Sequence, residues 1–478
     1  MTSHATEDYC VLGLGRTGAS VARWLLLNKE PSDARVWVYG GASSKEGETS
    51  RELESLGARV VLGTEEMPAP AHDGDYAFDL AIVSPGIPPH SAFFRAAEAC
   101  SAELIGEPEL AWRLSPERWV GITGTNGKTT TTTLVAHLLN AAGMPAETVG
   151  NIGTPAIERI DARAENSWFA AELSSFQLQT AKALKPVTAC LLNITPDHVE
   201  WHGTLEAYAA AKEHIFQNFG AEDLAVVSEE DDWCRAICER LEARGVRVCR
   251  LSVHGEPVGA DAAFVRGDDL VVRRAGEELV ACTISELPIK GEHNAQNALA
   301  ASAMALEVGV SLEALHAGLV SFAALEHRIE PCGQAGGVSF VNDSKATNTD
   351  SVEKALTAFG PGTVILLLGG HDKGTSLESL SREVVSRCKA AVCYGEAAER
   401  FAEALEAAAA ASGSGIALLR APHMAEALDV AIGIASEGDT VLLSPACSSF
   451  DEFSGFEERG RVFKRLVAEH IASGGASR

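Results

Sequence analysis

Basic residues are in deficit in this chain of 478 residues, which carries 39 Lys and Arg against 66 Asp and Glu and has a formal net charge of −27. Nucleic-acid binders need a basic surface, and proteins that adhere to anionic membranes need one too, so both classes are disfavoured. An anionic ligand must therefore be held by local lysines and arginines, by backbone N–H groups or by metal ions.

The sequence also lacks a CxxC pair, a secretory leader and a long apolar run. Its 11 cysteines are irregularly spaced, which disfavours a zinc site or a disulfide framework and indicates thiols in a reducing cytosol. The N-terminal segment MTSHATEDYC has no basic stretch followed by an apolar run, so we expect no signal peptide. Strongly apolar stretches such as residues 364–368 are strand-sized, whereas a membrane span needs about 20 residues. We expect a cytoplasmic protein without nucleic-acid or membrane partners.

Short apolar runs alternate with helical patterns along the whole chain, which is typical of α/β domains with mostly parallel sheets. The length suggests about three domains. Changes in the pattern near residues 107 and 326 predict domains at 1–106, 107–325 and 326–478.

The strongest motif is GITGTNGKTTTT at residues 121–132. A strand, a Gly-rich turn and a helix that begins at Lys128 form the arrangement that cradles phosphates. The glycines allow a close backbone approach, and the helix N-terminus supplies positive potential. Lys128 would reach the β- and γ-phosphates of a nucleotide, and Thr129 would offer a hydroxyl to Mg²⁺. Gly121 lies one position too far from Gly127 for the usual pattern, and a chance Gly-rich turn is the alternative.

Polar residues at two further strand ends could complete a metal site. Glu172 ends one apolar strand, and Asn193, Asp197 and His198 follow another. Ligands bind at the carboxyl ends of strands in open α/β sheets, where a carboxylate can hold Mg²⁺. Taken alone, however, Glu172 is better explained as a solvated strand-end carboxylate, and His198 is more often a loop histidine than a ligand. Lys212, in the helical pattern AYAAAKEHIF, taken alone is a solvated helix residue.

The first predicted domain contains GLGRTG at residues 13–18, between a strand and a helix. This pattern suits a phosphate-bearing ligand. The following strand ends in VWVYGGASS, without an acid that could bind a ribose 2′-hydroxyl, which disfavours NAD and a dehydrogenase. A nucleoside diphosphate remains open.

The last predicted domain has polar clusters at three strand ends, NDSKATNTD (342–350), GGHDKG (369–374) and SPACSSFDEF (444–453). Lys345 and Lys373 lie among small polar residues in a strongly acidic chain, which favours anion binding. Helix N-capping by Ser and Asn is the alternative interpretation.

In order along nearly the whole chain, these segments resemble the Mur ligase family, which joins amino acids to a peptidoglycan nucleotide precursor. GTNGKT, NITPDH and HNAQNA are similar to the family broadly. ELSSFQL, NDSKATN and SPACSSFDEFSGFEERG are similar to its D-glutamate-adding member. The resemblance implies a Rossmann-like N-terminal domain that binds the UDP precursor, a central P-loop ATPase-like domain and a Rossmann-like C-terminal domain that binds the amino acid.

The implied activity is an ATP-dependent amide ligation. ATP phosphorylates the L-alanine carboxylate of UDP-N-acetylmuramoyl-L-alanine, and the D-glutamate amine attacks the acyl phosphate. The resemblance further implies a monomer with two Mg²⁺ sites and a Lys212 side chain carboxylated by CO₂.

The resemblance also implies a role for individual residues. Catalytic roles fall to Lys128, His198, Lys212 and Lys345. ATP contacts fall to Gly124, Thr125, Asn126, Gly127, Lys128, Thr129, Thr130, Asn294, Asn297 and Arg328. Thr129 and Glu172 would serve the first Mg²⁺, and His198 and Lys212 the second. Substrate contacts fall to Arg16, Thr17, Ser84, Pro85 and Gly86 at the uridine diphosphate, Asn151 at the reacting end, Ser174, Gln177 and Phe456, and Lys345, Thr347, Lys373, Ser449 and Phe450 at D-glutamate.

Three segments depart from the family pattern. YGGASS stands where the family often has Asp-Thr-Arg, His371-Asp372 replaces an Asp-Gly pair, and Phe450 replaces a common leucine, which would reshape the glutamate pocket. Three alternatives remain open: a related ligase that adds another amino acid, a folylpolyglutamate synthase-like enzyme, and a nucleotide-sensing protein without ligase activity.

Overall fold

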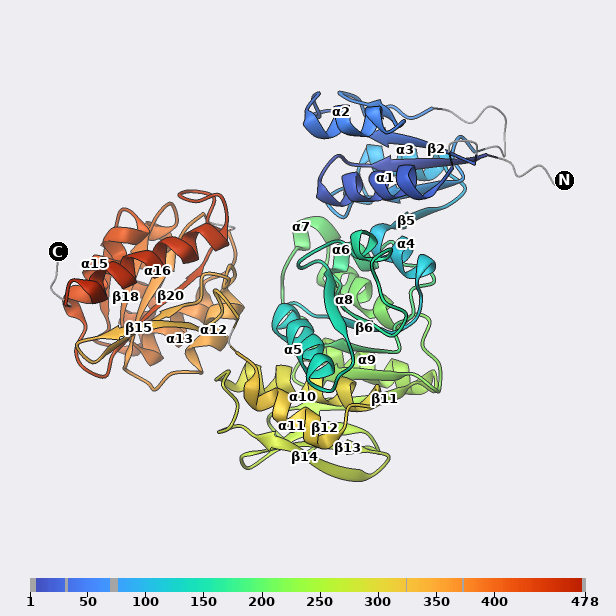
Figure 1. The fold of residues 1–478 in the computed structure, drawn as a ribbon. Coiled ribbons are helices and arrows are strands. Elements are labelled where there is room, and N and C mark those ends of the chain that lie inside the picture. The colour runs from blue at the N-terminus through green and yellow to red at the C-terminus, as the bar shows by residue number, and fades with distance from the viewer. Residues whose placement is uncertain (1–5, 31–32, 69–75, 324, 372–373, 475–478) are drawn as a thin grey trace. The chain divides into compact units, whose positions relative to one another are not determined.

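Three separate sheets organise the chain in a computed structural model (Figure 1). The structure describes residues 6–30, 33–68, 76–323, 325–371 and 374–474. They fall into two compact units, one with the chain up to residue 286 and residues 296–320, the other with residues 287–295 and the chain from residue 321 onward. The expected α/β class with mostly parallel sheets is confirmed. The boundaries at residues 107 and 326 stay predictions.

The first sheet has five parallel strands in the order β3-β2-β1-β4-β5. Its elements and the helix that follows are β1 (Glu7–Leu12), α1 (Arg16–Asn28), β2 (Ala34–Tyr39), α2 (Glu48–Ser55), β3 (Arg59–Val61), β4 (Leu80–Val83), α3 (Ala92–Cys100), β5 (Leu104–Gly106) and α4 (Glu107–Leu114). Because β2 and β4 lie on opposite sides of β1, the loops after β1 and β4 diverge and leave a crevice at the carboxyl ends of the strands.

The second sheet has nine strands in the order β14-β13-β12-β11-β10-β9-β6-β8-β7. Its elements are β6 (Trp119–Thr123), α5 (Lys128–Ala141), β7 (Ala146–Gly150), η1 (Ala156–Arg159), β8 (Trp168–Glu172), α6 (Ser175–Leu178), β9 (Thr188–Leu191), α7 (Val199–His202), α8 (Leu205–Glu213), η2 (His214–Phe216), β10 (Leu224–Ser228), α9 (Asp232–Ala243), β11 (Arg247–Ser252), β12 (Ala262–Arg266), β13 (Asp269–Arg274) and β14 (Glu277–Thr283). Two helices follow, α10 (Glu292–Glu307) and α11 (Leu312–Ser321).

Strand β6 lies between β8 and β9, and all five of its residues are buried. Burial on both faces explains why the strand is a continuous apolar run rather than an alternating pattern. The parallel register pairs Ile122 with Glu172 and Thr123 with Leu191. The loops that follow the three strands therefore leave the sheet at the same edge.

The far end of this sheet is an antiparallel meander of β12, β13 and β14. The pairing between β13 and β14 shifts register near Leu270. Arg266 and Arg273 each form ion pairs with Glu256 and Glu278. These pairs cross-link β12, β13 and β14 with one another and with the segment before β12.

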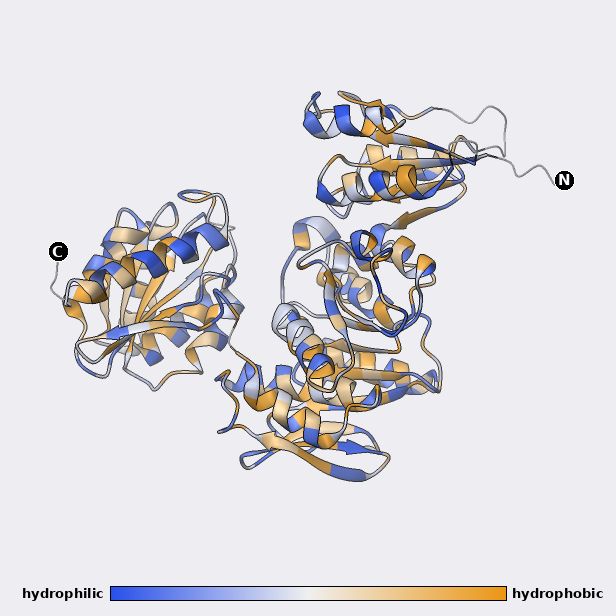
Figure 2. Ribbon diagram, viewed as in Figure 1, coloured by the Kyte–Doolittle hydropathy of each residue, from blue (hydrophilic) through white to orange (hydrophobic). Residues whose placement is uncertain are grey.

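The third sheet has six strands in the order β15-β16-β20-β17-β18-β19, all parallel except β15. Its elements are β15 (Glu330–Ala335), β16 (Val338–Asn342), α12 (Thr349–Leu356), β17 (Val364–Gly369), α13 (Glu378–Arg387), β18 (Cys388–Tyr394), α14 (Ala398–Ser412), β19 (Ala417–Ala421), α15 (Met424–Ile434), β20 (Thr440–Ala446) and α16 (Phe456–Ala472). In Figure 2 hydrophobic colours dominate the strands and hydrophilic colours gather on helices and loops. None of the helices in the described ranges has the length and hydrophobicity that a membrane crossing needs.

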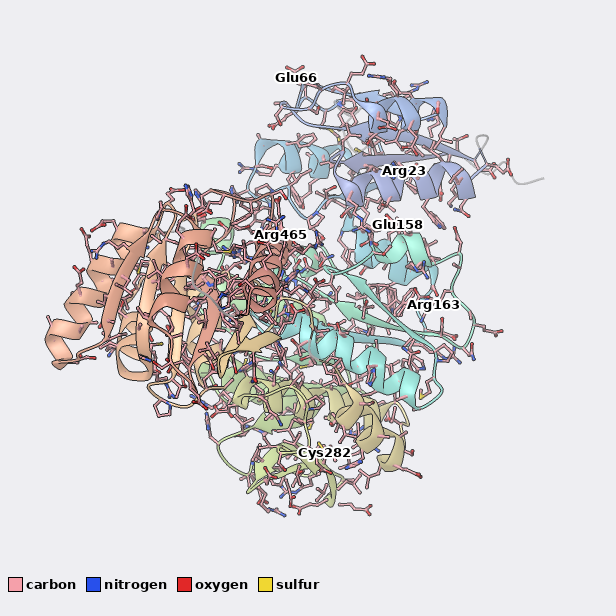
Figure 3. The ribbon with its side chains drawn as sticks, turned by 60° about the vertical axis from the view of Figure 1, so that its left-hand side comes forward. Arg23, Glu66, Glu158, Arg163, Cys282 and Arg465 are labelled. Carbon is pink, nitrogen blue, oxygen red and sulfur yellow. The ribbon has the colours of Figure 1, made fainter. Side chains whose placement is uncertain are left out.

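Two side chains, the half-buried Arg163 and the buried Glu109, tie loops to the second sheet. The Arg163 guanidinium (labelled in Figure 3) donates to the carbonyl oxygens of Ser115, Arg118 and Ser167 at 3.0–3.1 Å and stacks over Phe169. Glu109 is 1% exposed, and its carboxylate accepts three backbone N–H bonds from residues 182–184 at 2.8–3.0 Å. A single carboxylate thus anchors α4 to the loop before β9.

We predict that Glu109→Ala lowers the free energy of unfolding by about 3 kcal/mol, because three backbone N–H donors, that of Leu184 buried, lose their acceptor and Arg113 loses its buried ion-pair partner. Urea denaturation, together with amide hydrogen exchange at residues 182–184, measures this loss. Glu109→Gln keeps one carbonyl oxygen and is the matched control, with a smaller expected loss. Wild-type exchange protection in Glu109→Ala would show that the three donors have another acceptor.

Candidate functional site

The predicted strand, Gly-rich turn and helix are present at residues 119–141. The turn needs glycine at two points, since φ is 149° at Gly124 and 84° at Gly127, where side chains are disfavoured. Helix α5 begins at Lys128, and Gly127 gives it no side-chain cap. The first N–H groups of α5 are therefore available for an anion.

Lys128 folds back over this turn. Its Nζ donates to the carbonyl oxygen of Gly124 at 2.9 Å and to that of Thr125 at 2.7 Å. The ammonium group is thus held above the turn, next to the N-terminus of α5, and adds a full positive charge to the partial charge of the helix.

The segment after β9 holds the turn in place from the side. The backbone N–H of Thr125 donates to the Asn193 carbonyl at 2.9 Å, and that of Asn126 donates to Asn193 Oδ1 at 2.8 Å. Asn193 Nδ2 donates back to the Asn126 carbonyl at 3.2 Å. The asparagine that the sequence places at a strand end therefore shapes the turn.

Helix α10 closes the other side of the turn. Asn297 is 3% exposed, and its Oδ1 accepts a hydrogen bond from Thr131 Oγ1 at 3.2 Å. A β-carbon built on Gly127 would lie 2.4 Å from the same oxygen. Asn297, predicted at the nucleotide, is thus packed against the turn itself.

Glu172 is 2% exposed at the end of β8. Its Oε1 accepts a hydrogen bond from Asn151 Nδ2 at 2.7 Å, and the Asn151 backbone N–H donates to the Glu172 carbonyl at 2.8 Å. Its Oε2 is buried and has no hydrogen-bond partner among the described residues. A buried carboxylate oxygen without a donor suits a cation, so the residues fit the predicted Mg²⁺.

The described ranges contain no group of three or more His, Cys, Asp and Glu side chains that could hold a metal ion.

Lys212 is not the solvated helix residue that its sequence context alone suggests. It is 1% exposed, and its Nζ donates to the Gly124 carbonyl at 2.7 Å and lies 4.6 Å from the ring centre of Tyr208. Burial lowers the pKa of the Lys212 amine well below its usual value, and the Lys128 charge adds to the effect. The sequence AYAAAK did not predict that Lys212 is buried, because a helix of alanines shows little difference in hydrophobicity between its faces.

His198 lies at the start of α7 in the left-handed conformation, with φ at 52°. Its Nε2 is 3.6 Å from Asp197 Oδ2, and about half of the side chain is exposed. Its ring contacts Phe176 edge-on at 4.8 Å. The imidazole is thus half-exposed, and the Phe176 ring supports it.

Ser174 and Gln177 form a reciprocal capping box on α6. Gln177 N–H donates to Ser174 Oγ at 3.3 Å, and Ser174 N–H donates to Gln177 Oε1 at 2.9 Å. The hydroxyl and amide predicted to contact substrate therefore shape the segment that follows Glu172. Their substrate contacts stay a prediction.

The first sheet has a cleft of about 500 Å³ at the carboxyl ends of β1, β2 and β4. Its lining includes all five residues predicted at the uridine diphosphate: Arg16, Thr17, Ser84, Pro85 and Gly86. Gly40, Gly41, Ala42 and Ser43 of the departing YGGASS segment line it too. Arg16 and the uncapped N-terminus of α1 give this cleft an anion-binding end.

In the second unit, Lys345 and Phe456 are paired. Lys345 Nζ lies 3.8 Å from the ring centre of Phe456, a cation–π contact. The Thr347 N–H donates to the Lys345 carbonyl at 2.8 Å, so the two residues share one turn. Ser449 is buried, whereas Phe450 is 71% exposed.

The third predicted amino-acid-binding segment is only partly described. Asp372 and Lys373 lie outside the described residues. His371 N–H donates to the Ser448 carbonyl at 2.9 Å, and its Nδ1 lies 2.6 Å from Glu396 Oε2. His371 thus joins the 369–371 strand end to the Ser448 loop.

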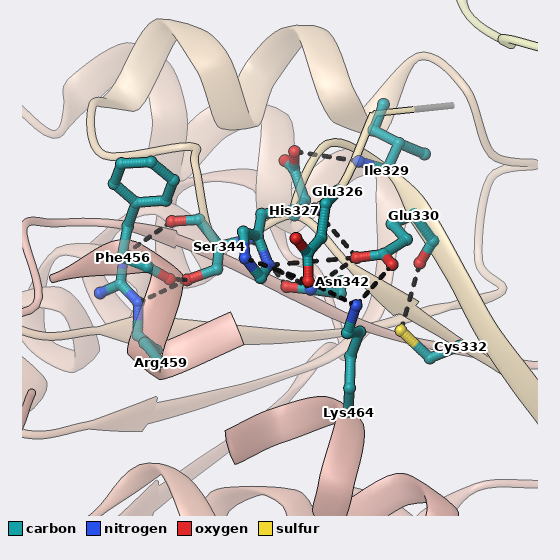
Figure 4. A network of polar contacts seen from close by, with 11 residues as sticks. Glu326, His327, Ile329, Glu330, Cys332, Asn342, Ser344, Phe456, Arg459 and Lys464 are labelled. Carbon is teal, nitrogen blue, oxygen red and sulfur yellow. Dashed lines mark hydrogen bonds and ion pairs between the residues drawn. The ribbon is translucent and has the colours of Figure 1, made fainter. Parts of the chain in front are cut away.

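Sequence reasoning missed Arg459, which is fully buried and joins two of these loops. Figure 4 shows its contact with Ser344. Its guanidinium donates to the Ser344 hydroxyl and carbonyl at 3.0 and 2.9 Å, and to the carbonyls of Cys447 and Ser448 at 3.1 and 3.3 Å. Lys345 and Ser449 directly follow these anchored residues. The only sequence signal is an arginine within the helical pattern of 456–472.

Arg328 and Asn294 also belong to the second unit. Asn294 Nδ2 donates to the Lys290 carbonyl at 2.8 Å. Asp343 is buried, and burial raises the pKa of its carboxyl group to about 7. The hydrogen bond from the Ser444 hydroxyl and the positive charge of Arg328 both lower this pKa and so oppose the increase. Asp343 is a further buried acid that sequence reasoning did not single out.

Two family models match the chain. The model of the Mur ligase middle domain matches residues 122–305, and the model of the Mur ligase glutamate ligase domain matches residues 327–447.

The chain is similar over nearly its full length to curated proteins named UDP-N-acetylmuramoylalanine--D-glutamate ligase. The one from Acidobacterium capsulatum is 38% identical over 462 residues, which cover 96% of each chain. The one from Desulfitobacterium hafniense is 38% identical over 460 residues, which cover 92% of this chain and 98% of that protein.

Solved structures share the fold. The pseudomurein peptide ligase type C of Methanothermus fervidus has a TM-score of 0.59 at 15% identity, with 97% of this chain and 100% of that chain covered. The UDP-N-acetylmuramate-alanine ligase of Thermotoga maritima has a TM-score of 0.56 at 20% identity, with 98% and 100% covered.

We predict that Gly127→Ala weakens ATP binding at least about tenfold, because the new methyl group collides with Asn297 at a backbone conformation that disfavours it. Gly143→Ala is the matched control, with φ of 73° and nothing within 4 Å of its β-carbon. It should lower thermal stability without changing ATP affinity. Calorimetric titration with ATP and Mg²⁺ measures both variants, and equal affinities would contradict the prediction.

Proposed function

This chain belongs to the Mur ligase family, and we propose that within it the chain is the ATP-dependent ligase that adds D-glutamate to UDP-N-acetylmuramoyl-L-alanine in peptidoglycan precursor synthesis. The full-length similarity to ligases of that name carries the proposal. A phosphate loop flanked by a buried carboxylate and two lysines supports it, because the reaction must bring a triphosphate next to a carboxylate.

The first step makes an acyl phosphate. The L-alanine carboxylate attacks the γ-phosphorus of ATP, and ADP leaves with the electron pair of the broken P–O bond. Lys128 and the first turn of α5 hold the phosphates, with Gly124 to Thr130 as the loop. Their positive charge offsets the repulsion between two anions and stabilises the charge on the phosphoryl group.

Glu172 and Thr129 would hold one Mg²⁺ against the phosphates, where the ion supplies charge neutralisation. The buried, unpaired Oε2 of Glu172 supports this assignment. Asn151 holds Glu172 through its amide and would orient the alanine carboxylate. Asn294, Asn297 and Arg328 would complete the ATP contacts.

The second step forms the amide. The D-glutamate amine attacks the acyl carbon, loses a proton, and phosphate leaves. Lys345, Thr347, Lys373 and Ser449 would bind the glutamate carboxylates, with Phe450 and Phe456 beside them. The cation–π contact with Phe456 holds the Lys345 ammonium in place. The exposed Phe450 side chain provides an apolar surface that D-glutamate can cover.

His198 and Lys212 would serve a second Mg²⁺, with Lys212 as its carbamate. Carbamate formation needs a neutral amine, which adds its lone pair to CO₂ and releases a proton. The low pKa of the buried Lys212 favours that neutral form. We further propose that the chain acts as a monomer in the cytoplasm.

We expect the purified chain with ATP, Mg²⁺ and UDP-N-acetylmuramoyl-L-alanine to release phosphate only when an amino acid is added, and D-glutamate should be preferred over L-glutamate and diamino acids. Phosphate release and product mass measure this. Equal use of L- and D-glutamate, or a preference for a diamino acid, would favour another ligase of the family.

Lys128→Ala should abolish turnover with the fold intact.

We expect Lys212→Ala to be inactive and to regain part of its activity with added short carboxylic acids, because a free carboxylate can replace the carbamate. Carbon NMR with ¹³C-labelled CO₂ should show a carbamate signal in the wild type that Lys212→Ala lacks. Full activity of Lys212→Ala, or the same signal in both proteins, would contradict the carboxylation.

A further inference from the structure

Four side chains on and around α6 and α7 form a continuous chain of hydrogen bonds. Trp201 Nε1 lies 3.1 Å from Gln179 Oε1, and Gln179 Nε2 lies 3.2 Å from His202 Nδ1. His202 Nε2 in turn lies 3.0 Å from Ser175 Oγ. None of these residues belongs to the site described above, and the chain runs from a tryptophan to the first residue of α6.

The direction of every bond follows from the indole. An indole N–H can only donate, so the oxygen of the Gln179 amide must face Trp201. The amide nitrogen then faces His202 and can only donate, so His202 Nδ1 must accept. A neutral imidazole that accepts at Nδ1 carries its proton at Nε2, which donates to Ser175.

The hydrogen bonds themselves require a neutral imidazole, because a protonated ring has no acceptor at Nδ1 for the Gln179 amide. A neutral ring offers one donor and one acceptor, and the chain uses both.

Phe176 joins the chain to His198. Its ring stacks on His202 at 5.6 Å and 16°, and it packs on Trp201 at 4.3 Å. The same ring contacts His198 edge-on at 4.8 Å. One phenylalanine therefore touches two members of the chain and the proposed metal-binding histidine.

The ends of the chain lie close in sequence to two proposed site segments. Ser175 follows Glu172 and Ser174, and His202 comes one helical turn after His198. His198 has a positive φ, a conformation that needs support from its surroundings in a non-glycine residue. α7 has four residues, too few to hold that conformation by its own hydrogen bonds.

We propose that Trp201, Gln179 and His202 form a directional positioning chain that fixes the His198 turn against the Glu172–Ser175 segment, with His202 as the Nε2–H tautomer. These hydrogen bonds fix the position of His198 relative to Glu172, the two sides of the proposed metal site. The expected effect on turnover rests on the proposed function, whereas the expected tautomer of His202 does not.

The tautomer is measured by ¹⁵N–¹H NMR of the full chain, with the His202 signals assigned by their loss in His202→Gln. We expect the proton on Nε2. Trp201→Phe keeps an aromatic ring against Phe176 but removes the donor that orients Gln179, so both tautomers should appear. A wild-type proton on Nδ1, or an unchanged tautomer in Trp201→Phe, would overturn the proposed direction.

Turnover tests the positioning role. His202→Phe keeps the stacking on Phe176 and loses both hydrogen bonds, and we expect kcat to fall about 10- to 100-fold, as for residues that orient a metal ligand. The KM for ATP should change less than about twofold, because the phosphate loop is untouched. His202→Gln restores an N–H donor for Ser175 and should recover most of the loss.

His316→Phe is the matched control, since this exposed imidazole pairs with Glu286 on the surface, and its kcat should be unchanged. Wild-type kcat in His202→Phe, or equal losses in His202→Phe and His202→Gln at equal melting temperature, would overturn the positioning role. If the wild-type protein itself fails to ligate D-glutamate, the proposed function fails. The NMR measurement then still decides the direction of the hydrogen bonds from Trp201 to Ser175.

Discussion

The carbonyl oxygen of Gly124 accepts hydrogen bonds from two lysine side chains, Lys128 at 2.9 Å and Lys212 at 2.7 Å. Two ammonium groups on one acceptor repel each other, and water cannot screen them, because Lys212 is almost fully buried. The loop can relieve this repulsion in two ways, by binding an anion or by keeping one lysine uncharged. The second outcome agrees with the lowered pKa of the buried Lys212 amine, which leaves Lys128 as the charged lysine of the loop.

Residues that lie at strand ends could be predicted from the sequence. Apolar runs located the strands, and parallel pairing then brought the loops after β6, β8 and β9 to one edge, which placed Gly127, Glu172 and Asn193 on the same side of the sheet. The cleft of the first sheet followed from the same rule. Its lining contains Arg16 and Ser84, which are 68 positions apart in the sequence but adjoin through the pairing of β1 with β4.

Residues whose role depends on tertiary contacts could not be predicted in this way. Lys212 lies on a helix of alanines, so no periodicity showed that it faces inward. Arg459 looks like a surface residue of α16, and only the folded chain shows that it satisfies carbonyl groups of two distant loops. His202 acts through Gln179 and Trp201, and a single sequence does not show how an amide or an imidazole side chain is oriented. Family resemblance indicated Lys212 but none of the others.

The meander of β12, β13 and β14 has a consequence for how the molecule behaves among its own copies. β14 is the last strand of its sheet and begins with Glu277 and Glu278, both exposed. The unpaired backbone groups of an edge strand can pair with a strand from a neighbouring molecule. Three features of this meander disfavour such pairing: like charges on β14, ion-paired arginines, and the shift in register between β13 and β14. The surface ion pairs of this meander add little stability. Their value lies in solubility, because they keep a nine-stranded sheet from extending into the next molecule.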